Sequence, residues 1–170
     1  MEKRLLIDLE LFRRDKKIET TCTYFYHPNN DGVKAIREMA TYAVICRQCE
    51  YANCVQSCPK EALEKQPDGL LKRYNLRCIA CKNCSIACPF GTILPELVPF
   101  YTSQCDFCLQ RISEAGIPDC VKTCSNTEAL KFEAVAEDPE KGIYFVGRYL
   151  AVKAWNFIDK LKKELTRELQ

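Results

Sequence analysis

Long hydrophobic runs are absent from this sequence of 170 residues. The basic segment 1–4 is followed by only three apolar residues, 5–7, before Asp8, which is too short an apolar core for a secretory signal peptide. No later stretch has the length needed to cross a membrane. We therefore expect a chain without a membrane span that works in the reducing cytoplasm.

A strong excess of one charge is absent as well. The sequence has 25 Lys and Arg against 23 Asp and Glu, a net charge of +2, and the two signs are interspersed. This distribution leaves no electrostatic footprint for nucleic acid or for an anionic membrane surface, and no basic recognition helix is visible. The sequence predicts no nucleic-acid partner and disfavours a DNA-binding oxygen sensor.

Histidine is nearly absent, since His27 is the single one in the sequence. A lone histidine can serve as a redox-linked base or as a metal ligand. His27, however, lies in a segment rich in turn-forming residues, and no matched partner is near it in the sequence. We interpret it as an ordinary loop residue.

Cysteine, in contrast, is abundant, with 13 residues, and twelve of these fall into three spaced groups. In a reducing compartment, clustered cysteines are more often metal ligands than disulfides. The middle group is followed by Pro89 and matches the ferredoxin pattern in which the fourth cysteine binds a neighbouring 4Fe-4S cluster. The groups are Cys46-x2-Cys49-x4-Cys54-x3-Cys58, Cys78-x2-Cys81-x2-Cys84-x3-Cys88 and Cys105-x2-Cys108-x11-Cys120-x3-Cys124.

The ferredoxin rule predicts how the first two groups combine. The fourth cysteine of each group completes the cluster held by the first three cysteines of the other. A hairpin signal between the groups, Pro67-Asp68-Gly69, would bring them side by side. The predicted ligand sets are Cys46, Cys49, Cys54 and Cys88 for one cluster, and Cys58, Cys78, Cys81 and Cys84 for another.

The third group needs a partner group, and the sequence retains a remnant of one. The segment Phe12-x2-Asp15-x2-Ile18-x3-Cys22 has ferredoxin spacing with its first three ligands replaced. Cys22 would then complete a third cluster, leaving Cys124 as a free thiol followed by Ser125 rather than by proline. The predicted third ligand set is Cys22, Cys105, Cys108 and Cys120, for a total of three 4Fe-4S clusters.

Two alternatives remain open for these sites. Cys22 could be a buried structural thiol, with the third group held by its own four cysteines, Cys124 included. Zinc could replace iron, although structural zinc sites commonly use two C-x2-C halves separated by about 15–20 residues. The gap from Cys108 to Cys120 is the closest approach to that spacing. The crowded first two groups favour iron.

The remaining segments predict local structure. Segment 5–11 alternates between apolar and polar residues from Ile7 to Leu11, as a half-buried strand does, and segment 129–135 alternates similarly. We expect the two segments to pair. Apolar residues from Val33 to Val44 recur at helical spacing after a cap at Asp31 and Gly32, which predicts a helix that ends before Cys46. A short run, 142–146, leads to an expected amphipathic helix that packs on its own domain or on a partner, with one face formed by Ala154, Ile158, Leu161, Leu165 and Leu169.

With these motifs, residues 5–135 resemble the iron-sulfur subunits of the dimethyl sulfoxide reductase and formate dehydrogenase type. The x4 gap before Cys54 and the x11 gap before Cys120 resemble the second and fourth cysteine groups of that family, whereas the first group is reduced to Cys22. The resemblance implies an α+β fold of two nested bacterial-ferredoxin-like modules with a C-terminal helix. We expect an outer module of residues 1–42 and 98–140, an inserted two-cluster module of residues 43–97, and a C-terminal extension of residues 141–170.

The resemblance also implies a function. Its members are electron-transfer subunits, not catalytic on their own, that relay electrons to or from a catalytic subunit, often of the tungsto- or molybdopterin type. An external electron carrier or a further redox subunit would be the other partner. The degenerate first group resembles the small subunit of tungsten enzymes of the aldehyde oxidoreductase type, such as tungsten-dependent benzoyl-CoA reductase. A free-standing polyferredoxin is the alternative.

Overall fold

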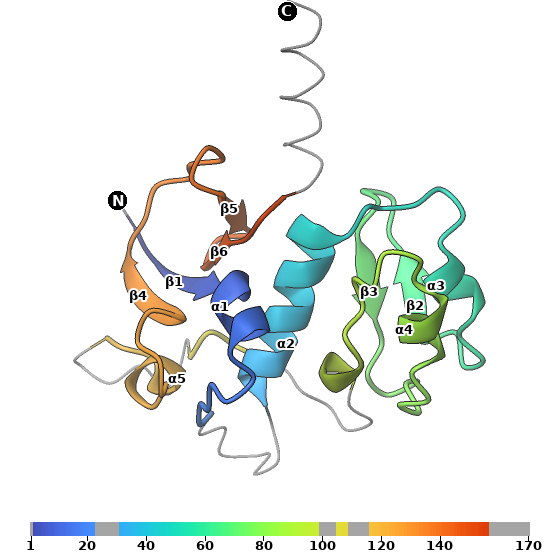
Figure 1. Ribbon diagram of the computed structural model, residues 1–170, viewed down its shortest axis with the longest axis horizontal. Helices are drawn as coiled ribbons and strands as arrows, with labels where there is room; N and C mark the ends of the chain where they lie inside the picture. Colours follow the sequence, from blue (N-terminus) through green and yellow to red (C-terminus); the bar gives the residue numbers. More distant parts are fainter. Residues whose placement is uncertain (1, 23–30, 99–104, 109–115, 157–170) are drawn as a thin grey trace, which may run out of the picture.

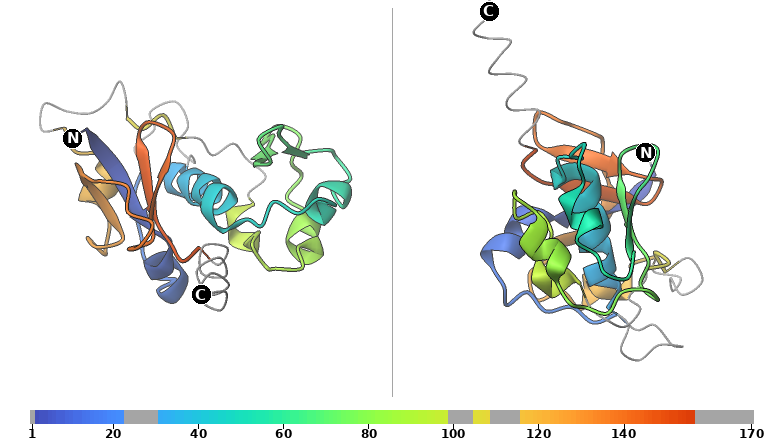
Figure 2. Two further views of the ribbon diagram at one scale, coloured as in Figure 1. Left: turned by 90° about the horizontal axis from the view of Figure 1, so that it is seen from above. Right: turned by 90° about the vertical axis from the view of Figure 1, so that its right-hand side faces the viewer.

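The computed structural model describes residues 2–22, 31–98, 105–108 and 116–156. The protein has an α+β fold in which helix α2 (Gly32–Ala40) lies between two lobes. In Figure 1 a four-stranded sheet lies on one side of α2 and a two-stranded hairpin on the other, and Figure 2 shows the same order from above. Across the described ranges, no helix is long and apolar enough to cross a bilayer.

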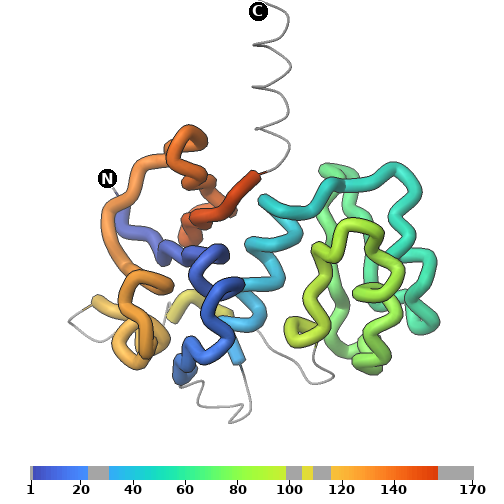
Figure 3. The backbone as a smooth tube through the Cα atoms, viewed as in Figure 1, coloured from blue at the N-terminus to red at the C-terminus, as the bar shows by residue number. Residues whose placement is uncertain are grey.

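The first lobe is built on a mixed sheet with the strand order β4-β1-β6-β5. Strand β1 pairs antiparallel with β4 and parallel with β6, and β6 pairs antiparallel with β5. Both ends of the described chain therefore contribute to one sheet, as the tube in Figure 3 shows. The strands are β1 (Lys3–Asp8), β4 (Leu130–Ala134), β5 (Ile143–Val146) and β6 (Leu150–Lys153).

The predicted pairing of the first strand with segment 129–135 is confirmed, but the strand itself is shorter than predicted. It ends at Asp8, and helix α1 (Leu9–Arg14) follows directly. The Asp8 carboxylate accepts hydrogen bonds from the N–H groups of Glu10 at 3.0 Å and of Leu11 at 3.1 Å. Such a cap satisfies amides at the start of a helix, and it stops the strand where the alternating pattern would continue it.

The predicted helix after Asp31 is confirmed. The Asp31 side chain accepts a hydrogen bond from the N–H of Lys34 at 3.0 Å and so caps α2. The helix continues into a π-helical turn, η1 (Thr41–Ile45), which ends at Cys46. This continuation connects a helix anchored in the first lobe directly to the first cysteine group.

The core of the first lobe lies between the sheet and α2. Each large aliphatic side chain buried there contributes about 1.5–3 kcal/mol relative to exposure. Its largest members belong to the strands and to α2 rather than to the cysteine groups. They are Ile7, Ile36, Leu130, Leu150 and Val152.

The second lobe contains the predicted hairpin, which is confirmed. Its two strands are β2 (Leu63–Lys65) and β3 (Leu71–Arg73). Short helices flank the hairpin, and the lobe has a separate small core that includes buried Cys78 and Cys84. The helices are α3 (Asn53–Gln56), α4 (Asn83–Ala87) and the 3-10 turn η2 (Pro95–Leu97), while α5 (Asp119–Lys122) belongs to the first lobe.

The described carboxyl-terminal segment differs from the prediction. Residues 142–146 were expected to lead into a helix that includes Ala154, but a second strand, β6, intervenes. Ala154 lies just beyond β6, is buried in the first core, and its N–H donates to the carbonyl of Gly142 at 3.0 Å. The β-branched and small apolar residues of β6 are buried because this strand pairs with β1 in the sheet interior. The other predicted helix positions, Ile158, Leu161, Leu165 and Leu169, lie outside the described residues, as does His27.

Candidate iron-sulfur sites

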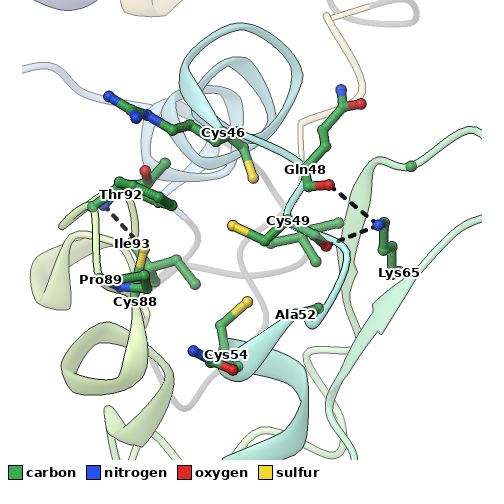
Figure 4. Close-up of a pocket in the computed structure, with 15 residues that line it drawn as sticks. Cys46, Gln48, Cys49, Ala52, Cys54, Lys65, Cys88, Pro89, Thr92 and Ile93 are labelled. Carbon is green, nitrogen blue, oxygen red and sulfur yellow. Dashed lines mark hydrogen bonds between the residues drawn. The ribbon is translucent and has the colours of Figure 1, made fainter.

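Four cysteines from different elements line one cavity in the second lobe. Cys46 follows η1, Cys49 lies in the next loop, Cys54 is on α3, and Cys88 follows α4. Figure 4 shows their four sulfur atoms pointing into a common space. The ligand set predicted for the first cluster is therefore brought together around one apolar hollow.

Cysteines of the second predicted set also lie together and contribute to the small core of the second lobe. The Cys84 thiol interacts electrostatically with Cys78, Cys58 and Cys81. Burial first, and then these neighbours, raise the Cys84 pKa to about 11. Helices α3 and α4, which carry Cys54 and Cys84, contact each other, so the two predicted sets lie in adjoining parts of the second lobe.

The third predicted set lines a cavity in the first lobe. Cys22, Cys105, Cys108 and Cys120 surround it together with residues of α2 and α5. Burial, and then the neighbouring thiols of this set, raise the pKa values of Cys105 and Cys120 to about 12. For each of these two thiols Cys22 is one of the interacting groups, although it lies some eighty or more residues earlier in the sequence.

Paired hydrogen bonds explain how Cys22 reaches this cavity. The N–H of Glu19 donates to the Ser125 hydroxyl at 3.0 Å, and the N–H of Ser125 donates to the Glu19 carbonyl at 3.0 Å. The N–H of Thr21 donates to the Thr123 hydroxyl at 2.9 Å, and that hydroxyl donates back to the Thr21 carbonyl at 3.2 Å. The segment before Cys22 is thus held beside the segment that follows α5.

A shared backbone conformation precedes the second cysteine of each group. Gln48, Ala80 and Phe107 all have left-handed backbone angles, with φ of 50°, 55° and 54°. Such a conformation costs about 1–2 kcal/mol for a residue with a side chain. When residues with right-handed and left-handed helical backbone angles follow one another, their N–H groups point to the same side. They form concavities that bind anions, including iron-sulfur clusters. The repeated strain is consistent with loops shaped around an anionic group.

Backbone N–H groups also point at the cysteine sulfurs. The N–H of Ala62 lies 3.2 Å from Cys58 Sγ, and the N–H of Thr92 lies 3.4 Å from Cys88 Sγ, in both cases four residues after the cysteine. Burial alone would raise the pKa of Cys88, but the N–H groups of Thr92, Phe90 and Ile93 outweigh it and lower that pKa. These donors favour a thiolate, which is the form that binds iron.

The four sulfurs of the first set line a hollow, as a cluster site would require. A structural zinc site needs its thiolates at about 2.3 Å from one centre. A cubane instead places a different iron under each cysteine, so its ligands surround a hollow, as the cysteines in Figure 4 do.

A family model described as a 4Fe-4S dicluster domain matches residues 37–148. This chain belongs to the 4Fe-4S dicluster domain family. The match begins within α2 and ends after β5, so it includes all twelve grouped cysteines of the dicluster domain. Cys22 lies outside the matched residues.

Relatives of this dicluster domain protein have names that refer to electron transfer. An Escherichia coli K12 protein named as the electron transport protein YsaA is 34% identical over 127 residues, which cover 66% of this chain and 78% of that protein. A component of the anaerobic dimethyl sulfoxide reductase of Escherichia coli K12 is 33% identical over 95 residues, 56% of this chain and 46% of the relative. A third, named as the oxidoreductase UacF, is 41% identical over 92 residues, but only 14% of its length is covered. The chain thus spans about half of the reductase component.

The remaining cysteine of the dicluster domain protein has a different environment. Cys124 is buried in the first core, and its Sγ donates a hydrogen bond to the Asn126 carbonyl at 3.0 Å. The N–H four residues after it, that of Glu128, donates to the Asn126 side chain rather than to the sulfur. The lining of the Cys22 cavity includes Cys105, Cys108 and Cys120 but not Cys124.

The replaced positions of the remnant group are part of the fold. Phe12 is a buried residue of α1, Asp15 is the residue at which α1 ends, and Ile18 packs against the first core. Helix α1 therefore stands where the other groups have a loop.

Sequence reasoning missed several polar residues that lie beside the cysteines. Lys65 on β2 donates to the carbonyl of Gln48 at 3.2 Å and to that of Cys49 at 2.8 Å, so it holds the loop of the first site, as Figure 4 shows. Arg73 on β3 lies beside Cys78. Both are single basic residues in a hairpin, and nothing in the cysteine spacing marks them.

Proposed function

We propose that this dicluster domain protein is the electron-transfer subunit of an oxidoreductase complex and holds three 4Fe-4S clusters. The observation that carries the proposal is the presence of three separate groups of four cysteines, each gathered from at least two distant segments. The ligands would be Cys46, Cys49, Cys54 and Cys88 in the first site, Cys58, Cys78, Cys81 and Cys84 in the second, and Cys22, Cys105, Cys108 and Cys120 in the third. When bound, each cubane accepts and donates one electron.

The residues around the sites support this role in two ways. Backbone N–H groups directed at Cys58, Cys88 and Cys105 stabilise negative charge on sulfur and so influence the potential. Apolar side chains of the two cores keep water from four of the twelve proposed ligands, since Cys78, Cys84, Cys108 and Cys120 are buried.

The exposure of Cys81 supports the proposal that electrons enter or leave the protein at the second site. Cys81 is the one exposed cysteine in the part of the chain that is described. Two exposed apolar residues of the same group region, Leu76 and Ile86, have exposed fractions of 92% and 83%. Exposed apolar residues can form part of an interface with a protein partner.

The nested arrangement belongs to the proposal as well. An outer module of residues 1–42 and 98–140 would enclose an inserted module of residues 43–97, with residues 141–170 as an extension. The two separate cores and the return of the chain to the first lobe, visible in Figure 3, support that division. The pairing of β6 with β1 supports close attachment of the extension.

The partner is inferred from the relatives. The name of the dimethyl sulfoxide reductase component refers to an anaerobic reductase complex, so we propose a catalytic subunit as the partner of this chain, under anaerobic conditions in the cytoplasm. The sequence resemblance supports a catalytic subunit of the tungsto- or molybdopterin type. The specific case that it supports is a tungsten enzyme of the aldehyde oxidoreductase type. The other partner would be an electron carrier or a further redox subunit.

Iron, acid-labile sulfide and zinc per chain, measured on protein purified without oxygen, test the cofactor content. We expect about twelve irons and twelve sulfides, four for each cubane. Stoichiometric zinc, or about eight irons, would contradict three clusters. Native mass of the chain expressed with its neighbouring gene products separates a subunit from a free-standing polyferredoxin, which would remain alone.

A further inference from the structure

A buried ion pair links α2 to the hairpin of the second lobe. The guanidinium of Arg73 on β3 forms a forked contact with the carboxylate of Glu38 on α2, with Nε–Oε1 at 2.5 Å and Nη2–Oε2 at 2.8 Å. The Arg73 side chain is 2% exposed and that of Glu38 is 12% exposed. Burying two charges is costly, and such a pair is weak evidence for stability by itself. The position of this ion pair therefore suggests a role other than stabilising the fold.

The pair lies against the second cluster site. The N–H of Cys78 donates to the Tyr74 carbonyl at 3.2 Å, so the chain folds back after β3 and places Cys78 beside the end of that strand. There the positive charge of Arg73 interacts with the buried Cys78 thiol. Arg73 thus has Glu38 on one side and a proposed cluster ligand on the other.

A third side chain completes the arrangement. The Tyr42 hydroxyl donates to Glu38 Oε1 at 3.1 Å, and Tyr42 belongs to the same small core as Cys78 and Cys84. Glu38 is thus held in place by both Tyr42 and Arg73. This fixes the direction of the charges, with the positive end toward the sulfur and the negative end toward α2.

Charge placed in this way affects an electron on the cluster. An added electron makes a cubane and its thiolates more negative, so a nearby cation and a hydrogen bond to sulfur favour the reduced form. A carboxylate behind the cation opposes part of that effect. Because the Arg73 and Glu38 side chains are both buried, their interactions are stronger than those between exposed groups.

We propose that Arg73 is a positioning residue that raises the reduction potential of the cluster held by Cys58, Cys78, Cys81 and Cys84, and that Glu38 limits the increase. The inference rests on the proposed function, since it needs that cluster. It assigns the second site a different potential from the first, where Lys65 is bound to backbone carbonyls of Gln48 and Cys49.

The test is a redox titration, followed by electron paramagnetic resonance, of the full chain with its clusters. In Arg73→Met we expect one cluster to become harder to reduce, with at least a tenfold fall in its reduction constant, which is about 59 mV for one electron. In Glu38→Gln the shift should have the opposite sign, because the cation is no longer opposed. A purely structural disturbance would not reverse its sign between the two variants.

Two more variants keep the test decisive. Glu38→Gln combined with Arg73→Met leaves no unpaired buried charge, so it can fold even if Arg73→Met does not, and its potential should lie between those of Arg73→Met and the unaltered protein. Lys72→Met removes the same charge from an exposed neighbour on β3 and should leave the potentials unchanged, because solvent screens that charge.

Unchanged potentials in all variants, or shifts of one sign in both single variants, would overturn the proposal. Fewer than twelve irons in the unaltered protein would instead count against the proposed function.

Discussion

At the scale of single residues, hydrogen bonds to sulfur distinguish the cysteines that close the three groups. Cys58 and Cys88 each accept the N–H of the fourth following residue. Cys124 occupies the same position in its group, yet its thiol donates to the Asn126 carbonyl. The contact made by Cys124 therefore differs from those of Cys58 and Cys88, and we expect Cys124 to be a structural thiol rather than a ligand.

A matched pair of serine variants tests this distinction. Cys22→Ser should lower the iron content from about twelve to about eight per chain, because one cubane loses a thiolate. Cys124→Ser should retain all twelve, since its contact to Asn126 can be made by a hydroxyl. Iron and acid-labile sulfide assays on anaerobic protein measure both. The opposite result, with loss of iron in Cys124→Ser alone, would mean that the third group binds its cluster without Cys22.

At the scale of elements, Asp8 determines where strand β1 becomes helix α1. Its carboxylate caps α1 and also contacts the Lys153 ammonium at 2.9 Å, on the neighbouring strand β6. Although Lys153 is half exposed, the Asp8 carboxylate itself is buried. One residue thus connects three elements of the first lobe.

Removal of that carboxylate should destabilise the lobe. We expect Asp8→Ala to lower the free energy of unfolding by about 2 kcal/mol, the upper range for the loss of a helix cap. Asp15→Ala, at the exposed end of the same helix, should change it by less than about 0.5 kcal/mol. Denaturant titration measures the free energy of unfolding of both variants. A loss in Asp8→Ala no larger than the loss in Asp15→Ala would contradict a stabilising cap at Asp8.

The turn before β5 depends on a glycine. Gly142 has a φ of +73°, and a Cβ there would lie 2.7 Å from the backbone oxygen of Ala154. Gly147, between β5 and β6, has a similar φ of +64° but open space around it. The two positions therefore share the conformational strain and differ in the contact.

Alanine variants separate these two costs. Gly147→Ala should lower stability by about 1–2 kcal/mol from backbone strain alone. Gly142→Ala should lower it by about 1–3 kcal/mol more, because the Ala154 carbonyl cannot move without disturbing the end of β6. Thermal unfolding of the two variants compares them. A Gly142→Ala protein as stable as Gly147→Ala would contradict the close approach.

At the scale of the whole molecule, the two cores depend on the cysteines to different degrees. The first contains large aliphatic side chains from the sheet and α2, such as Ile7 and Leu150. The second is small, and cysteines form a large part of it, with Cys78 and Cys84 buried and Cys54, Cys58 and Cys88 packed against them. We therefore expect apolar burial to hold the first lobe, and the second to depend on the proposed clusters.

Removal of iron should therefore unfold the molecule unevenly. After anaerobic chelation, we expect amides of β2, β3 and α4 to lose protection from hydrogen exchange, while those of β1, β4 and β6 keep most of theirs. Hydrogen exchange measured by mass spectrometry, on protein with and without clusters, resolves these segments. Uniform loss of protection would mean that the sheet also depends on the clusters.

The cysteine spacing and the polarity pattern were sufficient to predict much of this protein. Loops with fixed gaps between cysteines, the turn at Pro67-Asp68-Gly69 and the helix after Asp31 are local, and local residues determine them. The pairing of the first strand with segment 129–135 was predictable because both segments alternate. The spacing also predicted which cysteines meet at the first two sites, because the ferredoxin rule relates neighbouring groups.

Tertiary contacts decided the rest. Asp8 ends a strand whose pattern continues, because its side chain finds amides to cap and a lysine from β6. Strand β6 has a run of apolar residues that does not alternate, and its pairing with β1 on one side and β5 on the other makes it a strand. Arg73 and Glu38 are ordinary charged residues in the sequence, and they become a buried pair at Cys78 because α2 and the hairpin come together. Contacts between residues far apart in the chain carry no local signal, so the sequence determined the ligand loops while the fold determined their surroundings.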